Sequence, residues 1–212
     1  MQDAALFISV ISLLVSFVAL YVRGLQGATI GFQAGSTVGF SRFDDGFEIY
    51  MPATFSNAGQ RLGVVTRCAL VVWAPGMESM AYLIEWNEFR KQDHSDNHSD
   101  KRWVRDEFAG PVTVPGRASV TKVIHFRWAK GRVFLPPGEY KLVVCIWLVD
   151  SPRPTFTSTH RAQLPALELA AMVKPDDPDR DWPIRFVPLD EHLERNKVLT
   201  KSEVTQLLGR DS

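Results

Sequence analysis

The chain has 212 residues, with 24 basic and 24 acidic side chains, so its formal net charge is zero. This balance provides no basic face and excludes the electrostatic basis for nucleic-acid binding. The length fits one domain with attached segments. The 13 Phe and 6 Trp supply apolar side chains for a core. Aromatic and β-branched residues favour strands over helices after the first two dozen residues.

The amino end carries a long uncharged segment. Residues 4–22 contain no charged side chain. A helix of this length extends ~28 Å, close to the ~30 Å of a bilayer core. We therefore predict a transmembrane helix within residues 1–23, a lipid bilayer as the partner of residues 4–22, and a single-pass membrane protein. Arg23 follows the span and no basic residue precedes it, which favours a cytoplasmic carboxyl-terminal domain. The alternatives are a cleaved signal peptide and a buried helix.

Small side chains recur along this segment at alternating steps of three and four. Ser9, Ser12 and Ser16 therefore share one stripe of the helix. Small residues allow close helix packing in lipid, and their hydroxyls can bond across the contact. We predict a helix-pairing seam at these serines. The alternative is that each hydroxyl bonds back to the carbonyl four residues earlier.

Alternating apolar and polar residues predict an antiparallel β-sandwich over residues 37–164, after a flexible linker at 24–36. Two turn signals, at 44–46 and 57–60, contain Asp or Asn followed by Gly. The strands are expected at 37–43, 47–56, 62–73, 82–89, 111–114, 119–128, 140–148 and 155–163.

The two cysteines are predicted to point to opposite faces. Arg67 marks the outer face of its strand, so Cys68 points inward, whereas Cys145 shares the outer face with Lys141. No inter-sheet disulfide is therefore expected. The same assignment places Trp73 and Trp147 on the outside, where they form a candidate interaction surface. The alternative is that the long polar loop or the tail covers them.

The last segment, residues 165–212, is rich in Pro and Asp and is predicted to be a linker followed by a short tail helix. A capping box at 200–203 precedes an apolar stripe of Val204, Leu207 and Leu208. This stripe would dock on a partner or on the chain's own sandwich.

Two turns carry a resemblance to known folds. They are residues 57–59 before a core strand, and Leu135-Pro136-Pro137-Gly138-Glu139-Tyr140 before a late strand. Together with the uncharged amino-terminal segment, the chain resembles uncharacterised bacterial single-pass membrane-anchored proteins with an immunoglobulin-like or fibronectin-III-like β-sandwich. The resemblance implies that fold, and it implies no catalytic residue.

The densest group of metal-ligating side chains lies in residues 93–100. His94, Asp96 and His98 are a candidate site for a divalent ion. The alternative is a solvated polar loop. No nucleophile elbow and no P-loop occurs. His125 and His160 lie on polar strand faces and read as surface residues.

We therefore expect a membrane-tethered, non-enzymatic β-sandwich that binds another protein, with no cofactor. One alternative is a metal-dependent enzyme or metal-binding protein that uses the 93–100 loop. A second is a structural subunit of a membrane complex, assembled through its transmembrane helix.

Overall fold

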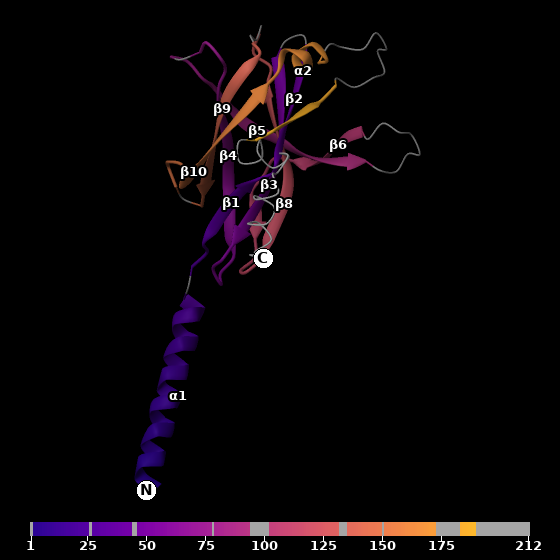
Figure 1. The fold of residues 1–212 in the computed structure, drawn as a ribbon. Coiled ribbons are helices and arrows are strands. Elements are labelled where there is room, and N and C mark those ends of the chain that lie inside the picture. The colour runs from indigo at the N-terminus through magenta and orange to yellow at the C-terminus, as the bar shows by residue number, and fades with distance from the viewer. Residues whose placement is uncertain are drawn as a thin grey trace, which may run out of the picture.

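The computed structural model describes residues 2–25, 27–43, 46–77, 79–93, 102–131, 135–149, 151–172 and 183–189. The prediction of a mainly β chain is confirmed (Figure 1). The elements are α1 (Gln2–Leu25), β1 (Ile30–Ala34), β2 (Thr37–Phe43), β3 (Gly46–Asn57), β4 (Gly63–Trp73), β5 (Tyr82–Asp93), β6 (Arg102–Phe108), β7 (Val112–Val114), β8 (Ser119–Trp128), β9 (Gly138–Leu148), β10 (Phe156–Leu164), α2 (Ala166–Ala170) and β11 (Arg185–Pro188).

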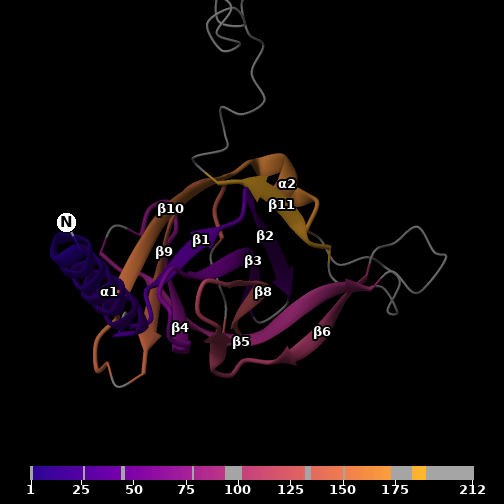
Figure 2. The same cartoon turned by 90° about the horizontal axis from the view of Figure 1, so that it is seen from below.

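The strands form one antiparallel sheet that curves into a nearly closed barrel. Its order is β10-β9-β4-β5-β8-β3-β2-β11, and β1, β6 and β7 pair with β3, β5 and β4. One strand joins the two layers, because the first part of β5 pairs with β4 and its later part pairs with β8. On the opposite side, an Ala162–Leu189 bridge connects β10 to the chain just past β11 (Figure 2). The immunoglobulin-like sandwich of two separate sheets is therefore wrong.

Strand β5 changes partner between Glu85 and Trp86, and a register shift follows between Trp86 and Glu88. This shift reverses which residues of β5 face inward, and the alternation of residues along the strand gives no sign of it. A barrel-like sheet and a two-sheet sandwich are thus equally compatible with the apolar pattern. This is the physical reason why the sequence favours the wrong architecture.

The amino-terminal helix forms as expected, but the prediction of a membrane span is contradicted. Helix α1 projects away from the strands, and its described side chains are exposed (Figure 1). In the part of the chain that the structure describes, no helix combines the length and the apolar character needed to cross a bilayer. The same finding contradicts three further predictions, namely the lipid partner of residues 4–22, the single-pass location and the cytoplasmic orientation.

The serine stripe of α1 shows the local alternative. The Ser16 hydroxyl donates to the main-chain oxygen of Ser12 at 2.8 Å. This is the bond to the carbonyl four residues earlier that serines form in helices. Pairing in lipid through Ser9, Ser12 and Ser16 loses its premise without the span.

The core lies between the two layers of the sheet. Phe47, Ile49, Met51 and Phe55 alternate along β3 and are fully or almost fully buried, as predicted. A bulge between Val65 and Arg67 changes the facing residues of β4. Val65 is consequently buried and Thr66 exposed, the reverse of a continuous alternation.

The cysteine assignment is confirmed. Cys68 belongs to the main core, while Cys145 belongs to a separate small cluster with Ala69 and Trp147 on the other face of the sheet. Both are free thiols. Burial raises the pKa of both thiols, which disfavours the reactive thiolate.

Two segments expected to be linkers contribute to the sheet. Strand β1 lies within residues 24–36 and pairs with β3, and β11 lies beyond residue 165 and pairs with β2. Val187 and Leu189 are buried, so a Pro- and Asp-rich stretch still supplies core residues at its end. The predicted tail stripe of Val204, Leu207 and Leu208 lies outside the described residues.

The turn at Asn57 is held by its side-chain amide, which uses all of its hydrogen-bonding positions. The Asn57 Oδ1 accepts from the main-chain N–H groups of Thr29 and Gly59, both at 3.0 Å. The Nδ2 donates to the main-chain oxygens of Arg61 at 2.7 Å and Val114 at 3.0 Å. One buried side chain thus ties β1, the turn after β3 and β7 together.

Replacing this amide should destabilise the fold strongly. Asn57→Ala removes four hydrogen bonds and leaves buried main-chain groups unpaired, so we expect a loss of about 3 kcal/mol in the free energy of unfolding. Urea denaturation measures it. The exposed Asn87 is the matched control, and Asn87→Ala should change stability little. Equal effects at the two positions would contradict the assigned role.

Candidate functional site

The outer face of β4 and β9 carries the surface predicted from the sequence. Ala69, Val71, Val143 and Cys145 form its apolar centre, called here the β4–β9 face. Register pairs Val71 with Val143 and Ala69 with Cys145 across the two strands. Trp73 and Trp147 lie at opposite ends of this centre, on the same face. The neighbouring strand β5 adds Leu83, which is 54% exposed.

A cation covers each tryptophan of the β4–β9 face. The Arg67 guanidinium lies 4.3 Å from the centre of a Trp147 ring, and the Lys141 ammonium lies 5.2 Å from that of Trp73. Arg67 is also paired with Glu85. These contacts restrain both indoles. Trp73 remains half-buried, whereas Trp147 is only 9% exposed.

A second group of polar side chains is buried on the outer face of the other layer. Glu48 and Tyr50 come from β3, His125 from β8 and Glu88 from β5. Trp103 of β6 packs against Tyr50 with ring centres 6.2 Å apart and against Phe186 of β11 at 5.7 Å. We call Glu48, Tyr50, Glu88 and His125 the buried polar cluster.

His125 lies at the centre of the buried polar cluster and is fully buried. Its Nδ1 is 3.1 Å from Glu88 Oε1, and its Nε2 is 3.4 Å from Glu48 Oε1. Both nitrogens are within ion-pair distance, although neither makes a well-aligned hydrogen bond. The Tyr50 ring stacks on the imidazole with centres 4.8 Å apart. Both nitrogens can donate together only in the protonated ring.

Arginines complete the charge balance of the cluster. Arg90 and Arg105 both pair with Glu88, while Arg127 lies 3.6 Å from Glu48. Glu88 is almost completely buried, and such a carboxylate requires paired cations. Because Arg105 belongs to β6, the pair fastens this strand over the sheet.

The protonation states follow from these contacts. Burial alone would raise the pKa of Glu48, but contacts with His125 and Tyr50 and the charge of Arg127 offset it and hold the pKa below its usual value. Burial and the charge of Glu48 raise the pKa of Tyr50. The phenol therefore stays protonated and donates to Glu48 Oε2 at 2.6 Å. Carboxylates, cations and phenol are engaged with one another, an arrangement that stabilises the fold.

The lowered pKa of Glu48 predicts acid sensitivity. A carboxyl with a lower pKa in the folded than in the unfolded chain stabilises the fold above its ordinary pKa, and this contribution is lost as the pH falls through the folded value. Glu48→Gln should therefore be less stable than the wild type near neutral pH and lose less stability on acidification. Urea denaturation between about pH 7 and pH 3 measures this.

The control for this experiment is Glu139→Gln. Glu139 is 60% exposed and lies 3.8 Å from Arg161. Its substitution should therefore leave the loss of stability on acidification close to that of the wild type. If Glu48→Gln lost as much stability on acidification as the wild type, the role assigned to Glu48 would be contradicted.

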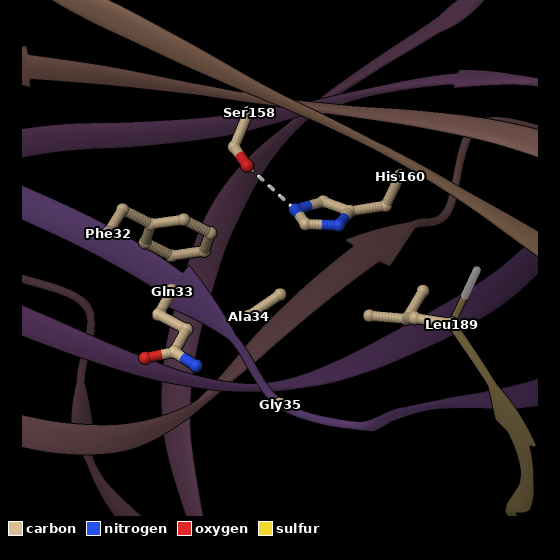
Figure 3. Close-up of a pocket in the computed structure, with 7 residues that line it drawn as sticks. All are labelled: Phe32, Gln33, Ala34, Gly35, Ser158, His160 and Leu189. Carbon is tan, nitrogen blue, oxygen red and sulfur yellow. Dashed lines mark hydrogen bonds between the residues drawn. The ribbon is translucent and has the colours of Figure 1, made fainter. Parts of the chain in front are cut away.

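A small cavity opens where β1, β10 and the end of β11 meet. Its volume is about 90 Å³. The Ser158 hydroxyl and His160 Nε2 are hydrogen-bonded at 2.8 Å, and Figure 3 shows both side chains on the same side of β10, facing β1. His160 is 8% exposed. The other lining residues are Phe32, Gln33, Ala34, Gly35 and Leu189.

Two histidines lie elsewhere than the sequence analysis predicts. His125 and His160 are buried, not on the surface. Glu85 and Glu88 meet different partners because β5 crosses between the layers: Glu85 lies where β5 pairs with β4 and contacts Arg67, whereas Glu88 lies where β5 pairs with β8 and faces His125. Neither the buried polar cluster nor the Ser158–His160 pair has a local sequence signature, since each depends on strand pairing or closure.

His94, Asp96 and His98 lie outside the described residues. Across the ranges that the structure covers, no three His, Cys, Asp or Glu side chains converge as metal ligands. In the buried polar cluster the two carboxylates face different nitrogens of one imidazole, which is a salt-bridge geometry.

Comparisons with known proteins provide no functional assignment. No family model matches the chain, and no curated protein matches it. One similar solved structure is a β-glucosidase from Erythrobacter marinus, with 15% identity and a TM-score of 0.30. The match covers 63% of this chain and 15% of the glucosidase. A likeness at this score carries no conclusion about fold or activity.

Proposed function

We propose that this chain is a non-enzymatic module that binds another protein through the β4–β9 face. The observation that carries the proposal is the pair of restrained tryptophans flanking an apolar centre. Protein interfaces combine an apolar centre with a polar rim. Tryptophan and arginine contribute most often to their binding energy. The β4–β9 face has this composition, with Arg67, Glu85 and Lys141 around Val71 and Val143.

The side chains of the β4–β9 face are already held in place without a partner, which supports the same proposal. The contacts of Arg67 with Trp147 and of Lys141 with Trp73 restrict the motions of four long side chains. A preorganised surface loses less side-chain entropy when a partner docks. Restrained aromatic side chains are thus a reason to favour this face over others as the binding surface.

The charges of the face describe the partner. Glu85 neutralises Arg67, whereas none of the ion pairs found among the described residues involves Lys141. We infer a partner protein with an apolar patch that covers Val71, Val143 and Leu83, and with an acidic side chain opposite Lys141. Complementary charge of this kind sets orientation and the rate of association.

Catalysis is the competing class of function. The buried polar cluster holds groups used in acid–base chemistry, but its carboxylates, arginines and tyrosine contact one another. General acid–base catalysis needs such a group within reach of a substrate proton. Their mutual engagement favours a structural role, which agrees with a binding module.

A charge placed at the centre of the face should abolish binding. We expect Val143→Asp to weaken partner binding at least tenfold, about 1.4 kcal/mol, because the partner would cover an unpaired carboxylate. The protein is immobilised, the captured protein is identified by mass spectrometry, and the complex is then rebuilt from purified components and measured by calorimetry.

Ser119→Asp is the matched control, since Ser119 is an exposed strand residue of β8, away from this face. It should bind like the wild type, and circular dichroism should show both variants folded. A rebuilt complex that tolerates Val143→Asp, or the absence of any protein whose capture depends on this face, would contradict the proposal.

A further inference from the structure

Strand β1 is bonded to β3 along one edge, and among the described residues no strand pairs with its other edge. The main-chain N–H of Ala58 donates to Thr29 at 2.9 Å, and that of Gly35 donates to Pro52 at 2.7 Å. Bonded and non-bonded residue pairs alternate in an antiparallel ladder. The two bonds lie at Thr29 and Gly35, so the odd-numbered residues of this stretch are the ones bonded to β3. The even-numbered Phe32 and Ala34 therefore point their N–H and C=O groups away from β3.

The open edge of β1 faces the side on which the barrel closes least. Among the described strands, only β3 pairs with β1, and only β9 pairs along β10. The two ends of the sheet meet through the single Ala162–Leu189 bridge. Unpaired edge groups are a template for another extended chain. The edge of β1 thus offers main-chain donors and acceptors beside the Ser158–His160 cavity.

The cavity adds side-chain selectivity to this edge. Phe32, Ala34 and Leu189 form an apolar wall, and Ser158 and His160 supply a hydroxyl and an imidazole (Figure 3). A strand added to β1 would turn every second side chain toward the interior, where these groups lie. The cavity volume of about 90 Å³ suits a short side chain. An oxygen on that side chain would bond with the serine–histidine pair.

We propose that β1 binds an extended peptide by strand addition, with one short hydroxyl, amide or carboxylate side chain of the peptide in the Ser158–His160 cavity. In this mode main-chain hydrogen bonds supply affinity and the pocket supplies specificity. The site is separate from the β4–β9 face and takes a different partner, an unfolded segment in place of a folded surface.

The test uses a phage-displayed library of random linear peptides and the full chain. Peptides that enrich are synthesised, and their affinity is measured by fluorescence polarisation. Ala34→Pro removes the outward N–H without removing a bond to β3, and proline is tolerated at such edge positions. We expect at least a tenfold loss of affinity in Ala34→Pro, and a changed preference for the pocket residue in Ser158→Ala.

Val143→Asp should leave peptide affinity unchanged, which separates this site from the β4–β9 face. Hydrogen exchange followed by NMR gives a readout on the unmodified chain. The Phe32 and Ala34 amides should be more protected with peptide than without it, whereas the protection of the Gln33 amide should not change. Three results would each overturn the proposal: no enriched peptide, no gain of protection at Phe32 and Ala34, or protection that rises with protein concentration alone.

Discussion

The passage of β5 from one layer to the other is the constraint on which the rest of the architecture depends. Strand β5 pairs with β4 up to Glu85 and with β8 from Trp86 onward, and a register shift follows between Trp86 and Glu88. A single strand therefore passes from one layer to the other and closes one side of the barrel. Bulges bend a strand and increase its twist. Because β5 pairs with both, β4 and β8 belong to one sheet and not to the two separate sheets that the apolar pattern suggests.

The passage of β5 from one layer to the other gives two carboxylates different roles. Glu85 emerges beside Arg67 at the rim of the β4–β9 face, half exposed, where its ion pair contributes little to stability. Glu88 emerges beneath β6 and meets His125, Arg90 and Arg105 away from water. A buried carboxylate that loses its partners is costly. The cluster therefore specifies where β6 lies more than it adds net stability.

The sequence predicts local features well and long-range pairing poorly. The strand at residues 37–43, the hairpin to β3 and the opposite facing of Cys68 and Cys145 follow from alternation and turn residues over a few positions. The burial of His125 does not, because Glu48, Glu88 and Trp103 come from three other strands. The cavity at Ser158 is equally invisible, since β1 and β11 lie in segments whose composition suggests linkers. The uncharged run at residues 4–22 predicts a helix correctly, whereas no helix among the described residues meets the requirements for a membrane span.

Incomplete closure explains why two different binding modes can coexist in one small barrel. A fully closed barrel has no free strand edge, and its surface can bind only through side chains. Here the main-chain groups of Phe32 and Ala34 in β1 do not bond to β3. The β4–β9 face, in contrast, is a continuous stretch of paired strands. In the proposed modes, the edge of β1 would recognise backbone and tolerate sequence apart from one pocket, whereas the β4–β9 face would recognise shape and charge through tryptophans held by cations. An Asp at Val143 and a Pro at Ala34 act on separate parts of the sheet, so the two modes are physically independent.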